Sequence, residues 1–215
     1  MPHHIHYVRW GALLALLASC ARGQELLDQI AARVENEIIL RSEVRALSRY
    51  QLLVDGKAES DDAILDRLVD QWIVKNEADT ARFPHPAEVE IAHGVEHLQA
   101  AFASPEEYQS RKKQSGLSDN EIRRMVAQQL YLSNYLDSRF RPAVQVSAKQ
   151  VEDFYQEAVI PRAKARNQAP PALDASRDYI QEALVQRGIN DQAEIWLKES
   201  RARLHVEKFL KESGK

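Results

Sequence analysis

Three side chains in one predicted helix have the types and spacing of a zinc site. His93, Glu96 and His97 form the string H-x-x-E-H, and on a helix the two histidines share one face, as zinc ligands require. Hydrolysis at zinc also needs a third protein ligand and a cleft that excludes water. Val95 and Leu98 occupy the apolar side of the same helix, so we expect the histidines on its solvent side. A zinc-dependent hydrolase stays an alternative function, and we predict no metal site.

Other catalytic patterns are missing from the sequence. It has no phosphate-binding glycine loop and no G-x-S-x-G elbow, and its single cysteine, Cys20, lies near the N-terminus. The acidic pairs 61–62 and 106–107 stand at predicted helix starts, where negative charge complements the helix dipole. The formal net charge of −3 provides no basic field for nucleic acid. We therefore expect no catalytic residue, no cofactor and no nucleic-acid partner.

The N-terminus has the pattern of a secretory signal, predicted over residues 1–23. Arg9 and several histidines precede the uncharged run 10–18, which is followed by small residues. The run is too short to span a membrane. Residues 17–20, Leu-Ala-Ser-Cys, also resemble a lipobox, in which Cys20 would be lipidated; ordinary cleavage after Ala21 or Gly23 is the alternative. We expect a periplasmic protein, either soluble or anchored as a lipoprotein.

The remaining elements are predicted to be mainly helical. Apolar runs at 29–34 and 37–40 predict a hairpin that turns at Asn36, and Ser42 is expected to cap the first helix. Pro86 is expected at the first position of a later helix, and capping boxes begin at Ser104, Ser118 and Ser147. Pro161 should end a short helix, Gly188 should close another, Asn190 should cap the last, and 204–209 should form a strand. These elements predict one compact helical core.

The order of these elements is similar to the N-terminal region of the SurA family and its relatives PrsA and PpiD. Residues 31–44 resemble the family's opening hairpin and helix entry, and 65–73 resemble its next helix. Residues 117–124 and 144–155 resemble two further capped segments. The resemblance implies a mainly α fold with a small N-terminal hairpin, closed by a returning C-terminal helix and strand.

The family's parvulin isomerase domain normally follows the segment at 144–155. Only residues 161–176, rich in proline, stand there, and about 100 residues cannot fit in that length. All seven glycines are isolated, whereas parvulins carry a paired-glycine turn. The expected organisation is a helical chaperone domain at 24–160, a linker at 161–176, and helices and a strand at 177–215 that complete the core.

The resemblance implies a periplasmic holdase that binds unfolded exported proteins, outer-membrane proteins above all, and has no isomerase activity. Such binding needs adaptable apolar side chains, although helical spacing alone does not separate a groove residue from a core residue. An envelope lipoprotein scaffold is a further alternative. The candidate peptide-binding residues are the large aromatic and Met side chains Trp72, Phe102, Tyr108, Met125, Tyr131, Tyr135, Phe154, Tyr155 and Trp196.

Overall fold

The computed structural model describes residues 28–210, and the predicted signal sequence and Cys20 lie outside this range. The described chain opens with a hairpin of β1 (Ile30–Val34) and β2 (Glu37–Leu40). The two strands pair antiparallel, with Val34 opposite Glu37. The left-handed residue of the turn is Glu35, with φ 53°, and not Asn36 as the sequence suggested. The predicted hairpin is confirmed.

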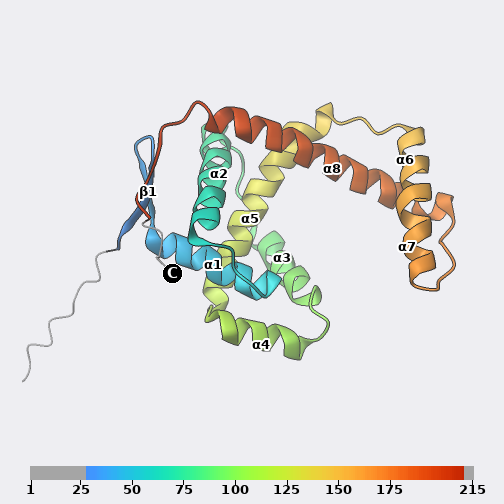
Figure 1. Cartoon of the computed structure of the whole chain (residues 1–215), viewed down its shortest axis with the longest axis horizontal. Helices are drawn as coiled ribbons and strands as arrows, with labels where there is room; N and C mark the ends of the chain where they lie inside the picture. Colours follow the sequence, from blue (N-terminus) through green and yellow to red (C-terminus); the bar gives the residue numbers. More distant parts are fainter. Residues whose placement is uncertain (1–27, 211–215) are drawn as a thin grey trace, which may run out of the picture.

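A third strand returns from the far end of the chain. Strand β3 (Val206–Lys208) pairs antiparallel with β1, with Arg33 opposite Glu207, so the strand order is β2-β1-β3. The Arg33 and Glu207 side chains form an ion pair at 2.7 Å on the exposed face of this sheet. The predicted returning strand is therefore confirmed, and the described ends of the chain lie side by side (Figure 1).

The other elements are helices, as predicted. They are α1 (Arg41–Asp55), α2 (Asp61–Thr80), α3 (Glu88–Ala100), α4 (Pro105–Ser115), α5 (Asp119–Phe140), α6 (Ala148–Phe154), α7 (Ile160–Ala165) and α8 (Leu173–Arg201). A 3₁₀ turn, η1 (Arg141–Ala143), follows α5, and a π turn, η2 (Tyr155–Val159), joins α6 to α7. The fold class is mainly α with a small antiparallel sheet.

Helix starts agree with the sequence where a capping serine was predicted, although only Ser118 and Ser147 form the full capping box; the Glu107 carboxylate accepts the Ala103 N–H and not that of Ser104. The hydroxyls of Ser104, Ser118 and Ser147 each accept the backbone N–H three residues later. The predictions for Ser42 and Pro86 are wrong. Helix α1 begins two residues earlier than a Ser42 cap predicts, with Leu40 in the cap position and the Glu43 carboxylate accepting the Leu40 N–H at 2.7 Å, and α3 begins two residues after Pro86.

Two predicted helix ends are also wrong. The helix of α6 continues through the π turn into α7, which runs through Pro161 to Ala165, so only residues 166–172 of the predicted linker are outside helices. Pro161 is accepted because it comes directly after the π turn, where the regular α-helical hydrogen-bond pattern is already interrupted. Helix α8 passes through Gly188 and Asn190 without interruption. Gly188 serves packing, since a Cβ there would come within 2.6 Å of Val144 Cγ1.

Buried side chains form three adjacent clusters. One joins the sheet to α1 and α2 around Val34, Val44 and Leu65, and the second joins α1 to α4 and α5 around Leu53. The third lies between α2 and α5 around Val74. Helix α8 crosses from α2 to a projecting arm made of α6 and α7, while α3 lies beside α5 and α4 lies below the end of α5 (Figure 1). No helix within 28–210 has the length and hydropathy needed to cross a membrane.

Candidate functional site

A large open groove of about 830 Å³ lies between α1, α2, α3 and α5. This volume exceeds that of any single side chain, so the groove can accept several residues of another chain. Its walls come from four helices, two of which, α1 and α2, are consecutive in sequence. The groove is lined mainly by Leu47, Tyr50, Val54, Gln71, Leu98, Met125, Gln128, Gln129, Leu132 and Leu136.

The two long walls follow from helical periodicity. Helix α1 contributes Leu47, Tyr50 and Val54, which recur at steps of three and four and share one face. On α5, Met125 and Leu132 occupy one face in the same way. Val54 is 41% exposed although it is apolar, which is the sign of a face that no element of the described chain covers. The groove surface is therefore an uncovered continuation of the core.

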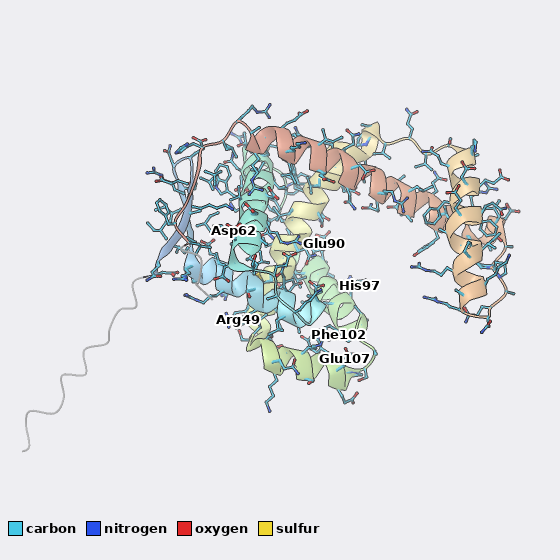
Figure 2. The ribbon with its side chains drawn as sticks, in the orientation of Figure 1. Arg49, Asp62, Glu90, His97, Phe102 and Glu107 are labelled. Atoms are coloured by element: carbon cyan, nitrogen blue, oxygen red, sulfur yellow. The ribbon has the colours of Figure 1, made fainter. Side chains whose placement is uncertain are left out.

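A glycine sets how closely α3 approaches α5. A Cβ at Gly94 would lie 2.7 Å from Val126 Cγ1 and 3.0 Å from Leu130 Cδ1. Any larger residue would push the helices apart, because real Cβ atoms are not found at such distances. The close contact brings His97 and Leu98, one turn further along α3, to the groove; Figure 2 shows His97 on α3.

Two hydrogen bonds cross between the walls. The Tyr50 hydroxyl donates to Gln129 Oε1 at 3.1 Å, and Gln128 Nε2 donates to Gln71 Oε1 at 3.3 Å. Burial raises the pKa of Tyr50, and the negative charge of Asp55 raises it further. The polar groups of the groove are thus mostly neutral amides and a hydroxyl, which can donate to and accept from a peptide backbone.

A second, smaller pocket of about 320 Å³ adjoins the groove. Gln71 and Gln128 line both, so their hydrogen-bonded side chains form the boundary between them. The smaller pocket lies beside β2, the edge strand of the sheet, and Ile38 of that strand is 50% exposed. Trp72 forms part of its wall. The two pockets together make one elongated depression, which we call the α1 groove.

Two of the nine predicted peptide-binding residues line this depression. Met125 belongs to the large pocket and Trp72 to the small one. Phe102 lies just beyond α3, where it packs edge-on against Tyr108 with ring centroids 5.3 Å apart (Figure 2). The structure brings Phe102 near the second core cluster and not into the groove lining.

Three of the predicted residues are core residues. Tyr108, Tyr131 and Tyr135 are 3–6% exposed, so another chain could reach them only if the helices separated. Tyr131 also donates its hydroxyl to Asp79 Oδ1 at 2.7 Å, and its pKa is raised to about 12, first by desolvation and then by this bond. Sequence periodicity places aromatic residues on apolar faces but does not distinguish a covered face from an open one.

The last three predicted residues lie elsewhere. Phe154 packs under the Arg187 guanidinium, and the Tyr155 hydroxyl donates to the Pro171 carbonyl at 2.7 Å, so both hold the arm together. Trp196 of α8 lies beneath the Arg139 guanidinium, 4.8 Å from the ring centroid. The nine residues therefore do not form a single surface.

The H-x-x-E-H string lies on the exposed part of α3, with His97 at the groove and His93 and Glu96 outside its lining. His93, Glu96 and His97 are all exposed, as the sequence predicted for the two histidines. Within residues 28–210 no group of three His, Cys, Asp or Glu side chains has a geometry that could hold a metal ion. The zinc alternative thus gains no support from the arrangement of these side chains.

Several groove residues were missed from the sequence. Leu47, Tyr50 and Val54 belong to a predicted helix, but the search for binding residues favoured larger aromatic and Met side chains. The signal that could have found them is the length of the apolar stripe on 41–55, which exceeds what one neighbouring helix covers. No protein-family model matches the chain, and no curated protein matches it significantly.

Proposed function

We propose that this protein is a holdase chaperone that binds unfolded segments of exported proteins, including outer-membrane proteins, in the α1 groove. The observation that carries the proposal is the open cavity of about 830 Å³ between four helices, to which α1, α3 and α5 contribute Leu, Val and Met side chains. Flexible apolar side chains adapt to many partners, and neutral amides can bond to any backbone. These are the requirements for binding without sequence specificity.

The SurA-type resemblance supports the same function. It implies an opening hairpin, helices and a C-terminal return, which is the order of elements in this fold. We propose that the chaperone works without isomerase activity, cofactor or nucleotide. Clients would bind by apolar contact and leave when their own folding buries the bound segment.

Suppression of client aggregation tests this function. An unfolded outer-membrane protein is diluted from urea with increasing amounts of the mature chain, and light scattering is followed. The test variant carries Val54→Gln and Met125→Gln, which remove apolar contact from the groove without adding charge. The amount needed for half suppression should rise by at least about fivefold, because two apolar contacts are lost.

A matched control carries Val89→Gln and Ile195→Gln. Both residues are apolar and exposed, at 60% and 55%, but neither lines the groove. This control should suppress aggregation as well as the unchanged protein, and both double variants should show the same helical circular dichroism. Equal loss in the two variants would refute the groove as the client site. Absence of suppression by the unchanged protein would refute the holdase function itself.

We further propose that the chain is exported through its N-terminal signal, with Cys20 as a possible lipidation site. Mass spectrometry of the mature protein from the membrane fraction would detect a diacylglyceryl group and an added acyl chain on Cys20. A Cys20→Ala variant should then move to the soluble periplasmic fraction. If the mature N-terminus instead follows Ala21 or Gly23, ordinary signal cleavage is the correct alternative.

A further inference from the structure

Acidic side chains lie at both ends of the α1 groove. Glu43, in the first turn of α1, lines the small pocket beside β2, and Asp55, at the end of α1, lines the large one. Glu37 of β2 adds a second carboxylate to the Glu43 end. Among residues 28–210, neither Glu37 nor Asp55 has an ion-pair partner within 4.0 Å, so their charges are open to a ligand.

The cations of the groove are neutralised by other partners. The Arg67 guanidinium donates to both Glu59 carboxylate oxygens, and Lys75 pairs with Asp79 at 2.6 Å. Of the Lys and Arg side chains in the described chain, Arg67 lines the large pocket and Lys75 lines the small one. The groove ends thus have a negative potential, and the Asp55 charge adds to desolvation in raising the pKa of Tyr50 on the groove wall.

The distance between Glu43 and Asp55 sets the length of peptide that fits between them. The groove-lining residues of α1 are Glu43, Leu47, Tyr50, Gln51, Val54 and Asp55, which follow one stripe of the helix. Glu43 and Asp55 are therefore separated by about 18 Å along α1, at 1.5 Å per residue. An extended chain advances about 3.3 Å per residue, so about five or six residues fit between the two acids.

We propose that the α1 groove binds an extended peptide segment in which about five residues, with apolar side chains, are flanked by a Lys or Arg at each end. The apolar side chains contact Val54, Leu98 and Met125, and the backbone passes over the Gln71–Gln128 boundary, where the amides can bond to it. The two basic side chains reach Glu43 and Asp55. This inference rests on the proposed holdase function and defines the segments that such a holdase would select.

Fluorescence anisotropy with labelled peptides tests the selection. Three peptides share a central Leu-Ser-Leu-Ser-Leu and differ in the residues on each side, which are Lys, Gln or Glu. At pH 7.5 and low salt, the mature full chain should bind the Lys-flanked peptide about fivefold to tenfold more tightly than the Glu-flanked one, as expected for two exposed ion pairs. The difference should shrink in 0.5 M salt because exposed charges are screened.

Paired variants show which side chains cause the preference for Lys-flanked peptides. Glu43→Gln with Asp55→Asn should remove the preference for Lys, and Gln at position 43 can still accept the Leu40 N–H that caps α1. The matched control, Asp178→Asn with Glu194→Gln, makes the same change in charge on exposed positions of α8 and should keep the preference. A Lys-flanked peptide with eleven central residues should bind like the Gln-flanked one.

The outcomes separate this inference from the function on which it rests. Tight binding of the Gln-flanked peptide with no effect of the flanking charge would overturn the charge selection alone. A Lys preference that survives the Glu43/Asp55 substitutions would also overturn it. If no peptide binds, and the protein does not suppress aggregation, then both the inference and the holdase function are wrong.

Discussion

Arg201, at the end of α8, lies against Asp66 of α2, with 2.5 Å between Nη2 and Oδ1. The two residues are 135 positions apart in the sequence. Asp70, one turn further along α2, is 3.4 Å from the same guanidinium, and Lys208 of β3 reaches both Asp62 and Asp66. A network of charges therefore fastens the returning end of the chain to α2 beside the sheet.

Replacing Arg201 with Ala should destabilise the fold by about 1–2 kcal/mol, because Asp66 then keeps only Lys208 as an ion-pair partner and Asp70 keeps none within 4.0 Å among the described residues. Burial raises the pKa of Asp70, an effect that Arg201 partly offsets. A raised carboxyl pKa means that ionisation costs stability, so the deficit of the variant should shrink as the pH falls and these acids become protonated. Urea unfolding at pH 7 and pH 4.5 measures both effects. A deficit that grows on acidification would contradict this role.

Substituting Gly188 by Ala tests the packing between α8 and the segment after α5. On an open helix surface this change stabilises, since Ala is the better helix former. Here the new Cβ would lie 2.6 Å from Val144 Cγ1, so we expect a loss of about 1–3 kcal/mol in the free energy of unfolding.

The control for this prediction is a second substitution that makes room. Val144→Ala combined with Gly188→Ala should recover part of the loss, and Asn190→Ala on the exposed side of the same helix should change stability little. If Gly188→Ala stabilises the protein, Gly188 does not mark a close contact.

The elements that could be predicted are those with a strong local signal. The patterns at Ser104, Ser118 and Ser147 mark helix starts because each serine hydroxyl accepts the backbone N–H three residues later. The helix ends predicted at Pro161 and Gly188 were wrong because proline and glycine can each either end a helix or lie within one. Only the neighbour that a glycine touches, or the turn in which a proline stands, decides between these roles.

The groove was less predictable than the fold. Met125 and Trp72 were identified, but Tyr131 was also selected, and it is buried. The sequence shows that a helix face is apolar, whereas the groove exists because α1, α2, α3 and α5 surround a space that no side chain fills, and the spacing of these helices depends on tertiary contacts such as Gly94 against Val126. Neutral residues such as Gln71 and Gln128 carried no sequence signal.

The capping box of α5 gives a prediction about acid stability. The Ser118 backbone N–H and hydroxyl, followed by Arg49, hold the pKa of Glu121 at about 2 (Figure 2 shows Arg49 on α1). Because the carboxyl pKa is lower in the folded than in the unfolded protein, the ionised carboxylate stabilises the fold. This stability is fully present above the unfolded pKa of about 4.3 and is lost as the pH falls towards 2. The stability advantage of the unchanged protein over Glu121→Gln should therefore decline between pH 4.5 and 2, measured by thermal unfolding.

Arg49 provides the internal comparison for that experiment. Because the Ser118 N–H is the largest cause of the shift, an Arg49→Met variant should keep most of this decline, whereas Ser118→Ala, which removes the hydroxyl, should reduce it. A pH-independent difference between the unchanged protein and Glu121→Gln would show that Glu121 does not act as the cap.

The histidines of α3 give the last prediction. His93 and His97 are exposed and one turn apart, and two such ligands without a third hold zinc weakly. We expect the mature protein, dialysed without chelator, to retain far less than one equivalent of zinc by emission spectrometry. His93→Ala should change neither this content nor aggregation suppression, since His93 lies outside the groove lining. One equivalent of tightly bound zinc that disappears in His93→Ala, together with hydrolytic activity, would favour the hydrolase over the chaperone.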